Sequence, residues 1–365
     1  MRLVPMLLIA VAVTASPSLA APSAPPDTGE LLLAGVQLHE AGEYDEAIRI
    51  FQRVLDADPS NADARYEMAY STFAKGDHLA AIEMLDKVVS IPETAPQGAW
   101  VLLGSSHAML GHWALAESVF RRGLAVRPQD PTLRFHLALS LSAQGRSEPA
   151  IDAFENCLRD SPYRAEIWRA FGDTLYDSGA RGRAFAAYAR SLTLEGDTPP
   201  SQQIAKRMWA MLFENLEAPA SAGDAGSVGV IRARVPTETA RSSPSAAEVA
   251  GMSMIGILRQ SGPWKDKSEA TFFVYALDTI LKLVSSLHAR ESDTAFWRPF
   301  VLAYFDSMRA GGHLEALAYD IRRAAGDPEG LLWRERNAAK LAAYRRSSES
   351  WAVDPGASAR REGRH

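Results

Sequence analysis

Apolar residues recur at steps of three and four along most of the chain after residue 27, which is the spacing of one face of an α-helix. The pattern also repeats over a longer distance. Five short helical segments share an alanine, at Ala47, Ala81, Ala116, Ala150 and Ala184, and successive alanines are 34, 35, 34 and 34 residues apart. A period of this length predicts a row of similar helical units that stack on one another.

Each unit has the pattern of two helices joined by a tight turn. A large side chain follows each alanine by four residues, and a glycine precedes it by five. The large residues are Phe51, Leu85, Phe120, Phe154 and Tyr188, and the glycines are Gly42, Gly76, Gly111, Gly145 and Gly179. Glycine permits the left-handed conformation that ends one helix before its partner starts. Pro59, Pro92, Pro128 and Pro162 close four units, because proline cannot continue a helix interior.

This pattern resembles the tetratricopeptide repeat (TPR) family over about residues 28–198. In the third repeat the signature positions are held by Trp100, Leu103, Gly104, Ala116, Phe120 and Pro128. The resemblance implies an all-α solenoid of helical hairpins with a concave inner surface. The fifth repeat lacks a closing proline, and the amphipathic segment 201–216 is expected to cap it, which gives a domain over residues 28–216.

The resemblance also implies which side chains line the concave surface. They are Tyr66, Tyr70, Phe73, Val101, Ser105, Phe135, Leu139, Arg169, Asp173 and Tyr176, with His39 at an equivalent place in the first repeat. Family members that clamp a C-terminal carboxylate carry lysine and asparagine at such places, whereas most of these residues are apolar or aromatic. We therefore expect a protein partner, which presents an apolar or extended peptide or a helix. The alternative is that these residues contact the chain's own linker or C-terminal helices.

The first 20 residues have the features of a secretory signal peptide. Arg2 gives a basic start, residues 3–13 form an apolar run too short to span a bilayer comfortably, and small residues precede Ala20. We expect cleavage after Ala20, no membrane span in the mature protein, and export to the periplasm of a Gram-negative bacterium. An uncleaved membrane anchor is the alternative.

The composition changes after the repeats. Residues 217–247 are rich in Ala, Gly, Ser and Pro, which is typical of a flexible linker, and two further readings of residues 227–235 are a brief strand pairing and docking against the groove. Helical spacing returns over residues 248–350 and predicts a second small helical domain, large enough for a core of its own. Within it, Gly311, Gly312, Ala316 and Pro328 predict a degenerate further hairpin. Residues 351–365 are expected to form a disordered basic tail.

The charge is unevenly spread. The chain has a formal net charge of −5, but residues 28–198 hold 16 basic and 24 acidic side chains, whereas residues 231–365 hold 20 basic and 16 acidic ones. This balance predicts no nucleic-acid partner. Two interpretations of the basic part stay open: it docks on an acidic surface, such as an anionic membrane or the repeats themselves, or its charges are simply solvated.

Candidate chemistry is sparse. The eight histidines form no HExxH motif, and His107 and His112 are five residues apart across a turn, so we expect no metal or other cofactor. The single cysteine, Cys157, is expected to be buried. Segment 251–256, GMSMIG, is one residue too long for a GxSxG nucleophile elbow. No catalytic residue is therefore expected.

These patterns favour a scaffold or adaptor for an envelope, cell-wall or secretion assembly. Two alternatives remain: an envelope enzyme with a catalytic C-terminal half, and a structural module whose C-terminal helices fill the groove. The oligomeric state is left open.

Overall fold

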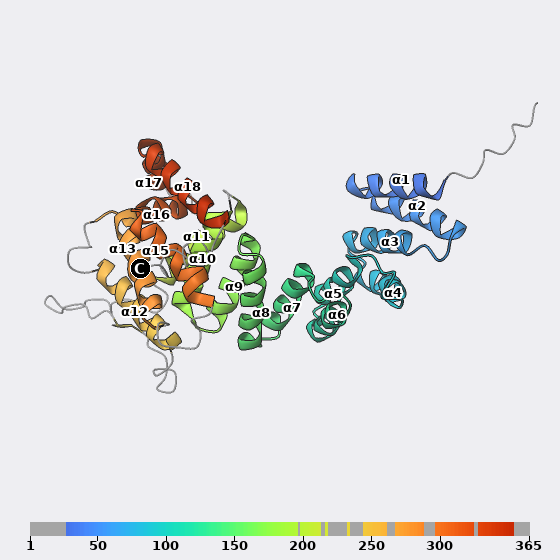
Figure 1. Cartoon of the computed structure of the whole chain (residues 1–365), viewed down its shortest axis with the longest axis horizontal. Helices are drawn as coiled ribbons and strands as arrows, with labels where there is room; N and C mark the ends of the chain where they lie inside the picture. Colours follow the sequence, from blue (N-terminus) through green and yellow to red (C-terminus); the bar gives the residue numbers. More distant parts are fainter. Residues whose placement is uncertain are drawn as a thin grey trace, which may run out of the picture. The chain divides into compact units, whose positions relative to one another are not determined.

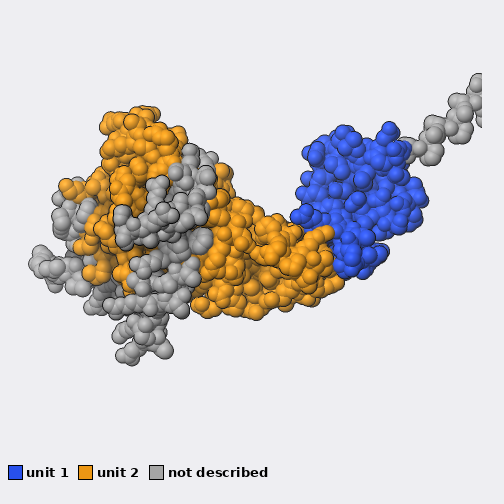
Figure 2. Space-filling view, viewed as in Figure 1, with its two compact units in different colours: residues 1–99 blue, residues 100–365 orange. Residues whose placement is uncertain are grey.

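The computed structural model of the chain describes residues 27–195, 198–212, 216–217, 232–233, 244–260, 267–287, 296–324 and 328–353. The chain divides into two compact units, residues 1–99 and residues 100–365 (Figure 2). The expected signal peptide at residues 1–20, most of the expected linker at 217–247 and the tail after residue 353 lie outside the described residues.

The predicted row of helical hairpins is confirmed (Figure 1). The first unit contains α1 (Thr28–Glu40), α2 (Tyr44–Ala57), α3 (Ala62–Ala74) and α4 (His78–Val89). The series continues with α5 (Ala99–Met109), α6 (Trp113–Val126), α7 (Pro131–Ala143), α8 (Ser147–Asp160), α9 (Ala165–Asp177) and α10 (Arg181–Leu194). The five turn glycines have positive φ angles, in a region that favours glycine. The angles are 80° at Gly42, 94° at Gly76, 76° at Gly111, 70° at Gly145 and 88° at Gly179.

A second glycine position lets the two helices of a hairpin approach closely. A Cβ atom on Gly35 would lie 2.4 Å from the ring of Phe51, and one on Gly104 would lie 2.2 Å from the ring of Phe120. Both rings are buried. Each aromatic ring of the second helix therefore packs directly on the backbone of the first.

The described residues in the rest of the second unit are also mainly helical, apart from one two-residue strand pair. It contains α11 (Pro199–Met211), α12 (Pro244–Gln260), α13 (Glu269–Leu287), the π-helical segment η2 (Trp297–Leu302), α15 (Ala303–Ala310), α16 (Leu314–Ala324), α17 (Pro328–Arg336) and α18 (Ala338–Val353). Strands β1 (Leu216–Glu217) and β2 (Arg232–Ala233) pair in antiparallel fashion, and β2 lies within residues 227–235, where a brief strand is one of the expected alternatives. Helix α12 begins inside the expected linker, and α18 ends inside the expected tail.

A further turn of the repeat type joins α15 and α16. Gly312 has a φ of 69°, and Ala316 is buried, as in the five hairpins before it. The first helix of this pair is irregular, since η2 immediately precedes α15. The structure thus contains the predicted turn, but only the second helix of the pair is regular throughout.

Helix α10 is enclosed on all sides. Each of residues 184–191 is 0% exposed, because α9 covers one side of the helix and α11, α12, α13 and α16 contact the others. One core extends from Ala138 in α7 to Tyr344 in α18. The expected separate core for residues 248–350 is therefore replaced by a core shared with the last repeats. The physical reason is that residues 184–191 of α10 are small or apolar on nearly every side, so the helix needs partners on its outer face as well.

Aromatic and charged side chains hold this shared core together. Phe296 and Trp297 pack against Phe171 of α9, with ring centroids 5.9 and 5.7 Å away. The guanidinium of Arg190 is fully buried in α10 and lies 4.1 Å from the centroid of the Tyr304 ring. Such a contact partly offsets the cost of burying the cation.

Candidate functional site

Helices α1 and α3 of the first unit bring three aromatic side chains together. Tyr66 and Tyr70 are one turn apart on α3, so their rings lie on the same side, 6.3 Å between centroids and inclined by 15°. His39 of α1 stacks on Tyr70 at 4.4 Å. We call His39, Tyr66 and Tyr70 the aromatic face. Tyr70 remains 41% exposed and offers a large ring to a ligand.

The ring of His39 is held by a hydrogen bond. Its Nδ1 lies 2.9 Å from Oγ of the buried Ser71, and that hydroxyl donates to the backbone carbonyl of Glu67 at 3.1 Å. The hydroxyl proton is thus used, which leaves Nδ1–H of the imidazole as the donor. Burial lowers the pKa of His39, although nearby Glu40 opposes this shift. The imidazole is therefore mainly neutral at pH 7.

Tyr66 is half-buried against the chain that follows the second hairpin. A Cβ atom on Gly98 would lie 2.3 Å from the Tyr66 hydroxyl oxygen, so a larger residue at this position would require the phenol to shift. Burial raises the pKa of Tyr66, and the charge of Glu67 adds to the rise. The phenol is consequently neutral at all ordinary pH values.

Phe73 belongs to the same predicted set but lies apart from the aromatic face. Its half-buried ring packs on His78, at the start of α4, with 4.9 Å between centroids. It thus supports its own hairpin. The structure brings Tyr66 and Tyr70 together with His39, and places Phe73 beside the turn.

The predicted groove residues on α5 and α7 belong to the second unit, and all are half-buried. They are Val101, Ser105, Phe135 and Leu139. The Phe135 ring contacts Phe154 edge-on at 6.2 Å, and the guanidinium of Arg164 lies 5.7 Å from its centroid. Leu139 packs against the main core. Phe135 and Leu139 therefore contribute to packing between neighbouring helices.

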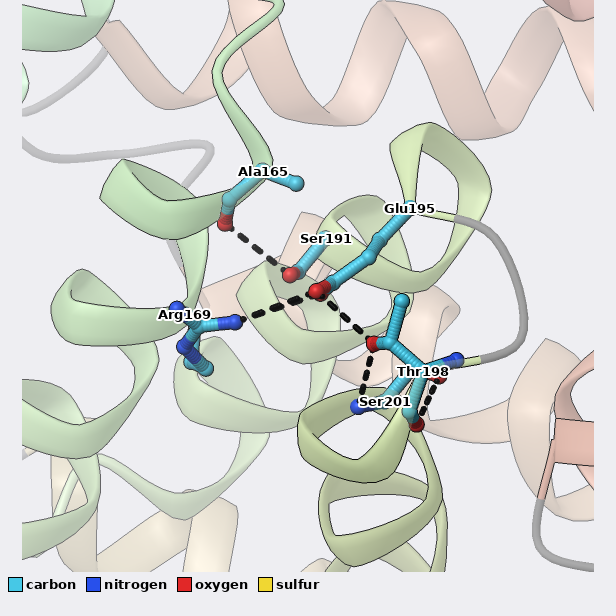
Figure 3. A network of polar contacts seen from close by, with 6 residues as sticks. All are labelled: Ala165, Arg169, Ser191, Glu195, Thr198 and Ser201. Atoms are coloured by element: carbon cyan, nitrogen blue, oxygen red, sulfur yellow. Dashed lines mark hydrogen bonds and ion pairs between the residues drawn. The ribbon is translucent and has the colours of Figure 1, made fainter. Parts of the chain in front are cut away.

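The predicted charged end of the groove is occupied by contacts within the fold. Arg169 of α9 is paired with Glu195, which follows α10, at 3.2 Å (Figure 3). Glu195 also accepts a hydrogen bond from Thr198 at 2.9 Å, and Thr198 forms a reciprocal capping box with Ser201 at the start of α11. Arg169 thus connects the fifth repeat to its capping helix.

Asp173 and Tyr176 are likewise tied to neighbouring groups. Asp173 accepts hydrogen bonds from the Tyr188 hydroxyl at 2.7 Å and from Arg207 of α11 at 2.5 Å. The Tyr176 ring lies under the guanidinium of Arg181, 3.5 Å from its centroid. Sequence reasoning placed these residues on α9 but missed their partners, which come from segments further along the chain.

A second candidate site lies among the C-terminal helices. A cleft of about 540 Å³ between α13, α15 and α16 is lined by Thr271, Val274, Tyr275, Asp278, Lys282, Arg309, Leu314, Glu315 and Tyr319. Asp278 accepts hydrogen bonds from Lys282 at 2.5 Å and from Arg309 at 2.8 Å. Burial alone would raise the pKa of Asp278, but these cations outweigh it and hold the pKa below its usual value. The cleft was not predicted, because its lining residues are scattered over three helices.

Two other groups singled out in the sequence lie inside the fold. Cys157 is buried, and burial raises its pKa to about 11. Ser253 of the GMSMIG segment is buried in the middle of α12. The part of the chain that the structure describes brings no three His, Cys, Asp or Glu side chains into an arrangement that could hold a metal ion. Every helix among the described residues is too short or too polar to span a bilayer.

The repeats match known family models. Three models described as tetratricopeptide repeat match residues 38–99, 96–140 and 133–162. Together they cover residues 38–162 and lie within the row of hairpins.

Curated relatives match less than half of the chain. The human protein O-mannosyl-transferase TMTC1 is 26% identical over 168 residues, which are 45% of this chain and 19% of that protein. The peroxisomal targeting signal receptor of Saccharomyces cerevisiae is 27% identical over 160 residues, 40% of this chain and 25% of that protein. The chain thus spans about a fifth to a quarter of the length of these relatives.

One similar solved structure is that of YrrB, which is described as a TPR protein with an unusual peptide-binding site. The match covers 50% of this chain and 92% of the YrrB chain, with 19% sequence identity and a TM-score of 0.41. The spacing of the alanines, the left-handed turn glycines and the matching models agree. The helical hairpins of this chain belong to the tetratricopeptide-repeat family.

Proposed function

We propose that the chain is a non-enzymatic scaffold that binds an extended peptide or a helix of a partner protein on the aromatic face. TPR proteins generally serve protein–protein interaction, and one matched relative is a targeting signal receptor. The observation that carries the proposal is the exposed ring of Tyr70, stacked on His39 and one turn from Tyr66.

The physical argument concerns preorganisation. His39 is fixed by Ser71, and Tyr66 is fixed against Gly98, so neither ring loses much freedom when a ligand binds. A tyrosine with a free edge contributes both apolar area and a hydroxyl, and such residues commonly dominate binding energy. The aromatic face is therefore suited to a peptide backbone with intervening side chains.

The far end of the predicted groove supports binding less well. Arg169 and Asp173 would have to break contacts with Glu195, Tyr188 and Arg207 before they could orient a ligand. We therefore assign Tyr66 and Tyr70 the main role in binding. We assign Phe73, Val101, Ser105, Phe135, Leu139, Arg169, Asp173 and Tyr176 a secondary role.

Asp278 of the C-terminal cleft is poorly suited to act as a general acid or base. Asp278 is ionised and held between Lys282 and Arg309. A general acid or base works best with a pKa near the operating pH, and this carboxyl is shifted in the opposite direction. The features of residues 1–20 favour an exported, periplasmic scaffold in a Gram-negative envelope, cell-wall or secretion assembly.

Photocrosslinking in cells that express the protein tests the proposal. A photoreactive residue replaces Tyr70 in one variant and Tyr163 in another, since Tyr163 has a similar exposed fraction of 42% but lies between α8 and α9. We expect a specific adduct with another protein at position 70 and none at position 163. Adducts at position 70 that contain only residues of this same chain would refute an adaptor role.

A further inference from the structure

The acidic excess of the repeats is confined to the first unit. Residues 27–99 contain 14 acidic and 5 basic side chains, a net charge of −9. Residues 100–195 contain 10 acidic and 11 basic ones, a net charge of +1. The two hairpins that carry the aromatic face are therefore far more acidic than the hairpins that follow.

The five basic side chains of residues 27–99 lie elsewhere. Lys75 pairs with Asp45, Arg49 pairs with Glu46, and Arg65 donates to the backbone carbonyl of Pro59. The remaining two are carried by the second helices of the hairpins, Arg53 by α2 and Lys87 by α4. The aromatic face thus has no positive side chain of its own at neutral pH, where His39 is mainly uncharged.

Glu67 is the acidic group next to the aromatic face. Residues 63, 66, 67 and 70 follow helical spacing along α3, so the carboxylates of Asp63 and Glu67 share a side with the two tyrosines. Glu67 is half-buried, and burial, with a smaller effect of Asp63, raises its pKa. Among the described residues of the first unit, no basic side chain pairs with Glu67. A partly desolvated carboxylate without a counter-ion favours the binding of a cation, because the cation offsets the cost of the buried negative charge.

Resting on the proposed function, we propose that the aromatic face takes a basic segment of its partner, with an arginine or lysine held between the Glu67 carboxylate and the exposed Tyr70 ring. A cation over a tyrosine face is attracted by the ring's quadrupole, and a carboxylate beside it adds an ion pair. The field of the whole unit attracts the same charge from a distance.

A segment of polypeptide fits these features better than a lone cation. Neither an exposed ion pair nor an exposed cation–π contact holds a small cation tightly. A peptide adds apolar contacts along Tyr66 and Tyr70 to the charge contacts, and so combines both kinds of binding energy. The occupant is therefore a protein segment that carries positive charge next to apolar side chains.

The test uses a library of random ten-residue peptides that spans acidic to basic net charge. The immobilised full-length chain captures peptides, which mass spectrometry then sequences. We expect enrichment of arginine and lysine over the starting library, and a loss of about threefold in that enrichment in Glu67→Gln. The matched control is Glu83→Gln, which removes the same charge from an exposed position on α4 of the same unit and is expected to leave the enrichment unchanged.

The outcomes separate the two proposals. Captured peptides that are neutral or acidic would overturn the basic-segment inference while leaving the peptide-binding function intact. Equal effects of Glu67→Gln and Glu83→Gln would show that only the overall field matters, and would also overturn the assignment to the aromatic face. Capture no greater than that of a folded Tyr70→Glu variant would overturn both proposals.

Discussion

The carboxylate of Glu248 in α12 accepts a hydrogen bond of 2.8 Å from the backbone N–H of Gly182, in the first turn of α10. The same oxygen accepts a second one from the N–H of Arg183 at 3.1 Å, and the side chain of Glu248 is 0% exposed. A helix N-terminus attracts negative charge, so this residue caps the repeat helix from a distant part of the sequence.

Glu248→Gln is therefore expected to destabilise the second unit by about 2 kcal/mol, because a buried charged cap is replaced by a neutral one near Arg183. All eight tryptophans lie in residues 100–365, so urea unfolding followed by tryptophan fluorescence reports on this unit. The control Glu148→Gln removes an exposed carboxylate from the first turn of α8 and should cost less than about 0.5 kcal/mol. Equal losses in both variants would contradict a special role for Glu248.

The close approach of Gly104 to Phe120 gives a second prediction. Gly104→Ala places a methyl group where the Phe120 ring lies, and we expect a loss of about 1–3 kcal/mol. The second repeat carries Ala69 and Leu85 at the equivalent positions, which indicates how the clash can be relieved. The double variant Gly104→Ala with Phe120→Leu should cost less than the sum of the single variants. Strictly additive losses in urea unfolding would count against a direct contact.

Cys157 should be almost unreactive in the folded protein. Its pKa of about 11, against 9.0 for an ordinary thiol, lowers the thiolate fraction about a hundredfold at pH 8, and burial adds a barrier to access. Iodoacetamide labelling followed by mass spectrometry measures this directly, since the chain has a single cysteine. We expect rapid labelling in denaturant and a native rate that keeps rising above pH 9. Similar rates in both conditions would place the thiol at the surface.

The half-buried ring of His136 predicts a loss of stability on acidification. It lies 5.4 Å from the Phe120 ring, and burial, helped by Arg164, lowers its pKa. Below about pH 6.5 the imidazole of the unfolded chain is protonated, whereas that of the native state stays neutral. The free energy of unfolding therefore falls as the pH is lowered, until the pH passes below the native pKa. The loss is about 1.4 kcal/mol for each unit by which the pKa is lowered.

Urea unfolding of the second unit at several pH values between about 5 and 7 tests this, with His136→Gln as the comparison. The variant carries no titrating group at this position, so its stability should depend less on pH than that of the wild-type protein. Parallel pH profiles for the two proteins would exclude His136 as the source.

The sequence predicted the hairpins well because their determinants are local. The repeat period of 34 or 35 residues identifies the equivalent positions of successive hairpins, and the left-handed turns favour glycine at Gly42 and its four equivalents. It also placed Tyr66 and Tyr70 on one face, since helical spacing alone decides that.

Contacts over long sequence distances were harder to predict. Arg169 and Asp173 were expected to face a ligand. Instead, Arg169 contacts Glu195, which is 26 residues later in the sequence, and Asp173 contacts Arg207, which is 34 residues later. One local feature of the sequence does indicate the shared core. Residues 184–191, AFAAYARS, are apolar on nearly every side, which is typical of a helix without a solvent face.

The enclosure of α10 bears on how such a protein can change over evolutionary time. Repeat arrays grow and shrink by duplication and loss of whole units, which only requires that each unit offer the same docking surface to the next. Here the outer surface of the fifth hairpin is already taken by α12, α13 and α16. A duplicated unit inserted after α10 would separate these helices from their partner, whereas one inserted before α9 would not. The number of repeats is therefore free to vary only on the N-terminal side of the last hairpin.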